Sequence, residues 1–153
     1  MHYKIIIYIS GLILFTGCIQ TQSSKVSENP RVQGVMVSEN PGFRGAMTIT
    51  GQNIQYPKTT SPEIIATILN FSPGEETGWH KHPVPTYTQV INGTLTIDLE
   101  NGETMEFPSG AGLLDTMNTW HNGRNTGDTN LQVVVIILGE KGKQNLIRRL
   151  PQQ

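Results

Sequence analysis

Two stretches decide the fold, GEETGWHKHPVPTYTQVING at residues 74–93 and GAGLLDTMNTWHNGRN at residues 110–125. They contain three of the four histidines of the chain, His80, His82 and His121. Side chains alternate between the two faces of a β-strand, so the His80 and His82 rings would share a face, roughly 6–7 Å apart along the strand. A third imidazole from a distant strand would complete a three-histidine site, which suits zinc, iron, nickel, copper or manganese.

Short apolar runs separated by turn residues surround these two stretches. The chain has 16 Gly and 9 Pro, and no stretch shows strong helical periodicity. An all-β sandwich or barrel typically has many short strands with regular turn signals between them. The predicted strands are 31–37, 53–56, 63–71, 86–91, 95–99, 104–107, 111–114 and 131–138, with an extended segment at 77–82.

Two Asn-Gly pairs lie between predicted strands. Asn92-Gly93 and Asn101-Gly102 are strong signals for two-residue β-hairpin turns. The sequence therefore predicts a hairpin at each pair. Residues 141–150 fit either a last turn of helix or an edge strand, and the pattern does not decide between them.

The pattern Gly74-x5-His80-x-His82-x3-Thr86-x6-Gly93 resembles the first motif of the cupin family, which carries Glu where Thr86 stands. A threonine hydroxyl is a poor neutral ligand for a divalent ion. This departure predicts weaker metal binding and one more coordination position open to water or substrate. Because Thr86 brings no negative charge, we also expect the site to tolerate an anionic substrate better.

The pattern Gly110-x5-Thr116-x-Asn118-x2-His121-x3-Asn125 resembles the second cupin motif, which has Pro and Gly where Thr116 and Asn118 stand. Asn tolerates the left-handed backbone that Gly would adopt, so Asn118 is a mild change. The two motifs occur in the family's order and at a plausible spacing. Together they are a specific signal, and predicted strands on either side extend the match.

The resemblance implies an all-β cupin barrel, a double-stranded β-helix or jelly roll, over residues 51–150. It also implies a homodimer and a metal ion in the barrel mouth, with His80, His82 and His121 as ligands. The expected cofactor is a divalent transition metal: iron, zinc, nickel or manganese. The alternative is a site that no longer binds metal, in which the histidines are buried core residues with hydrogen-bonded ring nitrogens.

Other side chains near the motifs are candidates for the pocket wall. Gln89 could be a weak oxygen donor only if the strand phase shifts by one residue, and core packing explains Tyr87 and Met117 equally well. Tyr87 and Asp115 are the nearest candidates in sequence for a general acid or base. The predicted pocket residues are Thr86, Tyr87, Gln89, Met117 and Asn125.

Four more side chains lie beside the predicted ligands. Trp79 and Trp120 directly precede histidines, so they would point to the opposite face, where we expect packing rather than substrate stacking. Arg124 fits an anion site at the mouth or, more simply, a solvated surface. Glu76 shares the phase of the His pair but lies about 13 Å from His80 on a straight strand, so it is not a predicted ligand.

The N-terminal part predicts export. Lys4 precedes an apolar run at residues 5–15 that ends in Thr16-Gly17-Cys18, which is typical of a secretory signal and too short to span a membrane. Phe15 to Cys18 resembles the bacterial lipobox, apart from Phe where Leu is usual. We therefore expect a signal peptide at 1–18, lipidation of Cys18, and a tether and N-terminal arm at 19–50. The alternative is an ordinary signal peptide with an incidental cysteine.

Composition narrows the possible functions. The net charge is −1 and only 15% of residues are charged, which argues against nucleic acid or anionic lipid as the main partner. The expected partner is a small-molecule ligand or substrate, with the membrane engaged only through a lipid on Cys18. The leading hypothesis is an envelope metalloenzyme, dioxygenase-like or isomerase/lyase-like. The alternatives are a non-catalytic envelope lipoprotein that binds a metal or small ligand, and a purely structural metal.

Overall fold

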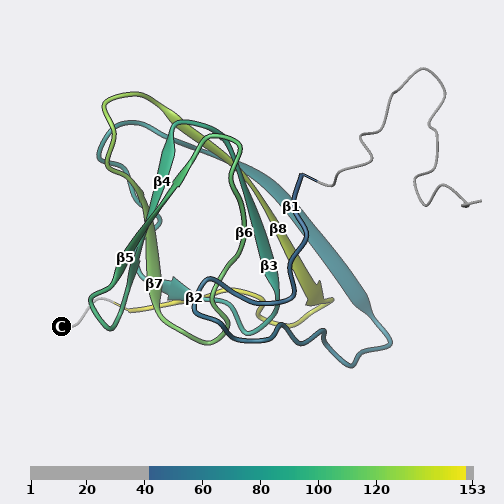
Figure 1. Ribbon diagram of the computed structural model, residues 1–153. Coiled ribbons are helices and arrows are strands. Elements are labelled where there is room, and N and C mark those ends of the chain that lie inside the picture. Colours follow the sequence, from purple (N-terminus) through teal and green to yellow (C-terminus); the bar gives the residue numbers. More distant parts are fainter. Residues whose placement is uncertain (1–41, 151–153) are drawn as a thin grey trace, which may run out of the picture. The chain divides into compact units, whose positions relative to one another are not determined.

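The computed structural model describes residues 42–150, which all lie in the second of two compact units, Asn40–Gln153. Within this range the chain is all-β and forms a double-stranded β-helix (Figure 1). No helix among these residues is long and apolar enough to cross a bilayer. The strands are β1 (Pro62–Phe71), β2 (His80–Lys81), β3 (Thr86–Asn92), β4 (Thr94–Leu99), β5 (Thr104–Pro108), β6 (Gly112–Leu114), β7 (His121–Asn125), β8 (Leu131–Glu140) and β9 (Ile147–Arg148).

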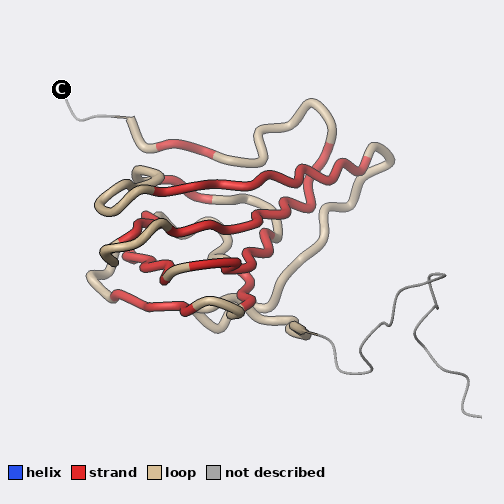
Figure 2. Tube along the Cα trace, turned by 90° about the horizontal axis from the view of Figure 1, so that it is seen from above, coloured by secondary structure: helices blue, strands red, loops and turns tan. Residues whose placement is uncertain are grey.

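The strands form two antiparallel sheets. One has the order β1-β8-β3-β6 and the other the order β5-β4-β7-β2-β9. Seen from above, strands joined by loops and turns account for the whole described chain (Figure 2). Strands that are distant in sequence lie side by side, as β1 does with β8 along ten residue pairs from Pro62↔Glu140 to Phe71↔Leu131.

The core lies between the two sheets and follows the period-two alternation of each strand. In β8, Leu131 and Val133 are 0% and 2% exposed, whereas alternate residues face outward. Ile97 on β4 is 2% exposed and belongs to the same core cluster. Apolar residues in this phase therefore hold the two sheets together.

Most of the predicted strands are confirmed, with three differences. No strand forms at 53–56, where a single bridge pairs Met47 with Asn53. Residues 141–150 contain the short edge strand β9 rather than a helical turn. Strand β7, which carries His121, was not among the predicted strands because its polar sequence HNGRN lacks an apolar alternation. The predicted strand 31–37 lies outside the described residues.

The two Asn-Gly pairs behave differently. Asn101-Gly102 joins β4 to β5, which pair as a hairpin. The hairpin predicted at Asn92-Gly93 is wrong, because β3 and β4 belong to different sheets. A register shift between Val90 and Asn92 precedes this corner, and bulges of this kind bend and twist a strand. The pair therefore marks the point where the chain crosses from one sheet to the other.

The segment before the barrel also contacts it. The Ile49 N–H donates to the Leu114 carbonyl at 2.9 Å. Residues 42–50, expected to be part of an N-terminal arm, are thus hydrogen-bonded to the edge strand β6.

Candidate metal centre

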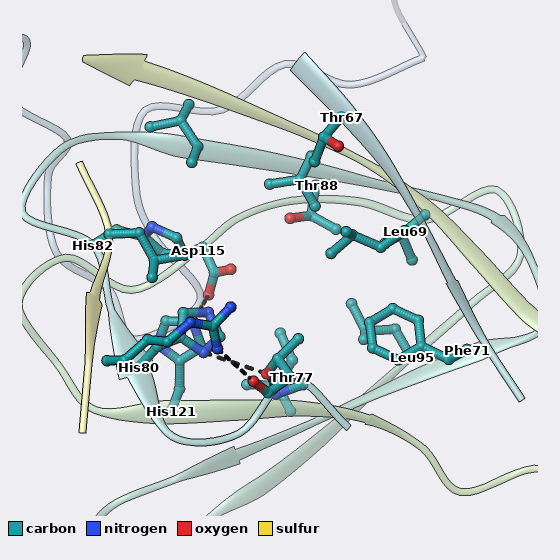
Figure 3. A pocket seen from close by; sticks show the side chains of 17 residues that line it. Thr67, Leu69, Phe71, Thr77, His80, His82, Thr88, Leu95, Asp115 and His121 are labelled. Carbon is teal, nitrogen blue, oxygen red and sulfur yellow. Dashed lines mark hydrogen bonds and ion pairs between the residues drawn. The ribbon is translucent and has the colours of Figure 1, made fainter. Parts of the chain in front are cut away.

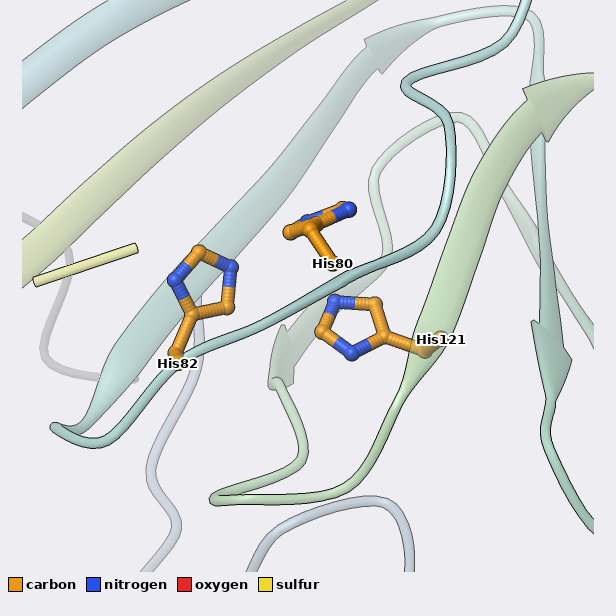
Figure 4. A group of neighbouring side chains, drawn as sticks. All are labelled: His80, His82 and His121. Atoms are coloured by element: carbon orange, nitrogen blue, oxygen red, sulfur yellow. The ribbon is translucent and has the colours of Figure 1, made fainter. Parts of the chain in front are cut away.

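Strands β2 and β7, with the residue that follows β2, bring the histidines together (Figure 4). His80 on β2 lies directly opposite His121 on β7 in the antiparallel register, and their ring centroids are 4.3 Å apart. His82, two residues beyond His80, is bridged to Met117. The ligand atoms that the three histidines offer lie within 4.8 Å of one another, and all three side chains are buried. The arrangement predicted from the two motifs is therefore present, and it could hold a metal ion.

The three histidines open into a cavity of about 260 Å³ between the sheets (Figure 3). Its residues come from one phase of each strand, as expected for inward-facing side chains. The histidines and Asp115 lie on one side of the cavity, and a mostly apolar wall lies on the other. The lining residues are Thr67, Leu69, Phe71, Thr77, His80, His82, Thr88, Leu95, Ile97, Asp115, His121, Gly123, Val133, Val135, Ile137, Leu146 and Arg148.

The Nδ1 atom of each histidine contacts a backbone carbonyl. His80 Nδ1 lies 2.8 Å from Gly78 O, and His82 Nδ1 lies 3.3 Å from Asn145 O. His121 Nδ1 lies 3.1 Å from Thr119 O. A carbonyl oxygen can only accept, so each Nδ1 carries a proton, and each ring in its neutral form has an Nε2 lone pair for another partner.

His121 supplies the most direct sign that the site is made for a ligand. Its Nε2 is buried and makes no well-aligned hydrogen bond with any described residue, although Asp115 Oδ1 lies 3.4 Å away. Buried polar atoms are nearly always paired. An imidazole Nε2 whose opposite nitrogen is oriented by a carbonyl is the usual form of a metal-binding histidine. The donor set therefore fits a transition metal ion.

The protonation of His80 and His82 follows from burial. Burial, together with the neighbouring His121 and His82, lowers the pKa of His80 to about 4. Burial also lowers the pKa of His82, although Asp115 opposes that shift. Both rings are therefore neutral at pH 7, which is the form that binds metal.

His121 and Asp115 form a buried pair. Asp115 Oδ1 lies 3.4 Å from His121 Nε2, and Asp115 is 7% exposed. Burial acts to lower the pKa of His121, but the Asp115 carboxylate outweighs it and raises that pKa above its ordinary value. Burial acts to raise the pKa of Asp115, but His121 and His82 outweigh it and hold that pKa below its ordinary value. The carboxylate is thus ionised beside the histidines.

Two of the five predicted pocket residues face away from the cavity. The strand phase does not shift, because Thr86, Thr88 and Val90 of β3 face inward. Tyr87 and Gln89 therefore lie on the outer face of the sheet, where the Tyr87 hydroxyl donates to Gln89 Oε1. As a result, neither side chain is among those that line the cavity.

The other three also fall outside the lining. Thr86 is 1% exposed and faces inward, but it is not among the residues that line the cavity, and its carbonyl accepts from the Asp115 N–H. The Asn125 side chain donates to the Phe71 and Thr129 carbonyls at 3.1 and 2.8 Å. It therefore connects the end of β1 to the loop between β7 and β8. Met117 lies at the corner before β7, where its N–H donates to a glutamine side chain.

The charged residues near the motifs have definite places. The Arg124 guanidinium is paired with Asp98 on the outer face, so it is not an anion site of the cavity. Glu76 is exposed and accepts from the Asn122 side chain at 2.8 Å, in agreement with its exclusion as a ligand. The cation that lines the cavity is Arg148, whose Nη1 donates to the Thr77 carbonyl at 2.8 Å. Sequence reasoning missed Arg148 because it lies in the C-terminal segment, far from both motifs.

Both tryptophans point away from the cavity, as predicted. Arg149 is placed over both rings, with its guanidinium carbon 5.2 Å from the Trp79 centroid and 4.7 Å from that of Trp120. Lys81 Nζ lies 4.8 Å from the Trp120 ring. These cation–π contacts brace the outer side of the strands that carry His80 and His121.

Comparison with known proteins agrees with this site. Residues 67–137 match the family model for the cupin domain, and that range includes all three histidines. This part of the chain is similar to cupin domains. Its site departs from the family motif at Thr86, where Glu is usual, and Asp115 is the carboxylate that the structure places beside the histidines instead.

A relative and two solved structures show how far the similarity extends. Auxin-binding protein 1 of Arabidopsis thaliana is 31% identical over 99 residues, which cover 60% of this chain and 48% of that protein. The chain thus spans about half the length of this relative. The crystal structure of the DMSP lyase DddQ from Ruegeria pomeroyi has a TM-score of 0.50 at 16% identity, covering 59% of this chain and 45% of that one. A Klebsiella pneumoniae protein with a double-stranded β-helix domain has a TM-score of 0.49 at 19% identity, covering 61% of this chain and 90% of that one. The likeness to the Ruegeria structure is one of fold.

Proposed function

We propose that the cupin domain binds a divalent transition metal ion through His80, His82 and His121 and acts as a metalloenzyme on a small molecule. The observation that carries the proposal is the orientation of the rings. Each Nδ1 is held by a carbonyl, and the Nε2 of His121 is buried without a hydrogen-bond partner among the described residues. Three imidazole donors are suited to iron, zinc, nickel or manganese.

The cavity indicates what kind of molecule would bind. Its far wall is apolar, with Leu95, Ile97 and Val133 among the lining residues, so it would receive a hydrocarbon part and exclude water. The polar group of the substrate would then lie at the histidine side, near Thr77 and Arg148. A bound ion would supply Lewis-acid chemistry of the isomerase/lyase type or, if it is iron, dioxygen chemistry.

The test is the metal content of the full chain, purified without a polyhistidine tag and measured by elemental mass spectrometry. The control is the double variant His80→Ala/His121→Ala. We expect near-stoichiometric metal in the wild type and none in the variant. Iron would favour oxygen chemistry, whereas zinc, nickel or manganese would favour a Lewis-acid role. The absence of metal from both proteins, after incubation with all four ions, would refute the proposal.

A non-catalytic binding function is the second candidate. Asp115 is the only carboxylate among the cavity residues, and Tyr87 faces outward, so few groups are available as a general acid or base. The relative Auxin-binding protein 1 is named for binding rather than catalysis. Mass spectrometry of a small-molecule library before and after incubation with metal-loaded protein separates the two. Binding without turnover would favour the second candidate, and new products that the double variant does not form would favour the enzyme.

We further propose that the protein is a homodimer. Ile64 and Ile68 on the outer face of edge strand β1 are 69% and 60% exposed, and the outward residues of β8 beside them include Val134 and Ile136. Apolar patches of this kind are common at protein interfaces. Light scattering after size exclusion should give twice the chain mass for the wild type and a single chain mass for Ile68→Glu. A wild-type monomer would refute the dimer.

We also propose export with lipidation at Cys18. The support is the sequence of residues 1–18 alone, which lie outside the described residues. Cells that express the protein should incorporate labelled palmitate into the wild type and not into Cys18→Ala. An exported protein without label would favour an ordinary signal peptide.

A further inference from the structure

Asp115 has a place in the metal centre that the motif comparison does not assign. It is 7% exposed, lines the same cavity as the histidines, and has Oδ1 3.4 Å from His121 Nε2. Figure 3 shows its carboxylate pointing toward the histidine cluster. The backbone N–H of Thr116 donates to Oδ1 at 3.0 Å. A buried carboxylate that accepts so few hydrogen bonds is suited to a cation beside it.

The strand register explains why a carboxylate at this position reaches the site. Tyr87 pairs with Leu114 in the antiparallel β3–β6 ladder, so Thr86 lies opposite Asp115, and the Asp115 N–H donates to the Thr86 carbonyl at 2.8 Å. Directly opposed residues of an antiparallel pair project from the same face, with Cβ atoms about 4.5–5.5 Å apart. Thr86 is the position where the first cupin motif carries Glu. The carboxylate has thus moved to the neighbouring strand and still faces the cavity.

We propose that Asp115 is the fourth protein ligand of the metal ion, in place of the motif glutamate that Thr86 replaces. This inference rests on the proposed function, in which the three histidines hold the ion. Two donors at about 2.1 Å from one ion lie roughly 3.0 Å apart at a right angle and about 3.4 Å apart at the tetrahedral angle. The 3.4 Å between Asp115 Oδ1 and His121 Nε2 falls within that range.

A role for Asp115 as a hydrogen-bond acceptor from His121 is the main alternative. It would require protons on both ring nitrogens, because the Thr119 carbonyl already holds Nδ1–H. Once Nε2 binds the ion it has no proton to donate. The carboxylate would then remain beside the cation, where binding the ion is its natural role. The site would carry one negative charge from the protein, so the preference for anionic substrates expected from an all-histidine set would disappear.

The experiment measures Zn²⁺ affinity of the full chain by competition with a chromogenic chelator, and the visible spectrum with Co²⁺. The variants are Asp115→Asn, which keeps the shape, and the double variant Asp115→Ala/Thr86→Glu, which returns a carboxylate to the motif position. Asp115→Ala alone is the matched control. We expect Asp115→Asn and Asp115→Ala to lose about 100-fold in affinity or more, with a changed Co²⁺ spectrum. Thr86→Glu should restore both in large part.

The possible failures are distinguishable. A wild type that binds neither Zn²⁺ nor Co²⁺, and takes up none of iron, nickel and manganese in the metal-content assay, would refute the proposed function. A wild type that binds while Asp115→Asn matches it in affinity and Co²⁺ spectrum would refute the role of Asp115 alone. Should the variants fail to fold, a crystal structure of the zinc-loaded wild type decides. An Asp115 oxygen within about 2.2 Å of zinc would support the proposal, and a water molecule in its place would overturn it.

Discussion

The two sides of the cavity are held by different forces. On the apolar side, Leu95, Ile97 and Val133 are 5%, 2% and 2% exposed and depend on shape and burial. On the histidine side, each ring is fixed by a particular hydrogen bond, such as the 2.8 Å contact of His80 Nδ1 with Gly78 O. The apolar side should therefore govern stability, and the histidine side should govern metal binding. The following experiments set these two expectations against each other.

The largest effect is expected for His82→Leu. His82 is 2% exposed, and leucine fills a similar volume without a metal-binding atom. Metal affinity should fall by more than about 100-fold, because a direct ligand counts for at least as much as an outer-shell partner. The metal-free protein should lose little stability, because an apolar side chain replaces a buried polar one. Chelator competition and urea unfolding with EDTA measure the two quantities. A large loss of stability in the metal-free protein, beside the loss of metal affinity, would contradict the assignment of metal binding alone to the histidine side.

Ile97→Ala is the opposite test. Ile97 is 2% exposed and belongs to the core cluster, so its truncation should lower the free energy of unfolding by about 2–4 kcal/mol through lost burial and a new cavity. Zn²⁺ affinity should change by no more than about twofold. Urea unfolding and chelator competition again provide the measurements. A large loss of affinity would mean that the apolar wall positions the ligands.

The histidine side was only partly predictable from the sequence. His80, His82 and His121 could be found because the motif spacing fixes their strands and phases. Asp115 was noted only as a weak acid or base candidate, because its proximity depends on the β3–β6 register that places it opposite Thr86. That register is a tertiary property. The sequence places Asp115 directly after the apolar pair Leu113 and Leu114, but this position does not identify the partner strand.

The strands and turns of the fold were also only partly predictable from the sequence. Strands β1 and β8 could be predicted from apolar β-branched runs, whereas the corner at Asn92-Gly93 was predicted as a hairpin. Local turn chemistry supports either outcome. The choice is made by packing, since a Cβ on Gly93 would lie 2.9 Å from the Asn130 carbonyl oxygen. The local sequence does not reveal a close approach of this kind, because the two segments are distant along the chain.

The pH dependence of the metal-free protein should reflect the histidine side alone. His80 in the folded state stays neutral down to pH about 4, whereas in the unfolded chain it takes up a proton near pH 6.5. Acid therefore favours unfolding between these values, by on the order of 1–3 kcal/mol, and His82 adds in the same direction. His121 acts oppositely, because its pKa is raised and its stabilising proton is lost as the pH rises above 6.5.

We therefore expect the metal-free protein to be most stable near pH 6.5. Urea unfolding in EDTA across pH 4–8 measures the curve. In His80→Leu the acid limb should flatten, because the group that takes up the proton is gone, while the alkaline limb should remain. Stability that keeps rising as the pH falls toward 4.5 would contradict this assignment of the neutral rings.

The smallest effect should come from the outer side of the histidine strands. Arg149→Ala removes the guanidinium placed over Trp79 and Trp120 and its ion pair with Glu100. The ion pair is exposed and adds little, so the loss in unfolding free energy should be about 0.5–1 kcal/mol from the cation–π contacts. Metal affinity should change by about twofold at most, because β2 and β7 remain paired at His80 and His121. Glu100→Ala is the matched control, since it removes the ion pair and leaves the stacking intact. If Arg149→Ala lowered Zn²⁺ affinity tenfold while Glu100→Ala did not, the tryptophan face would be positioning the ligands, and the histidine side would depend on more than its own hydrogen bonds.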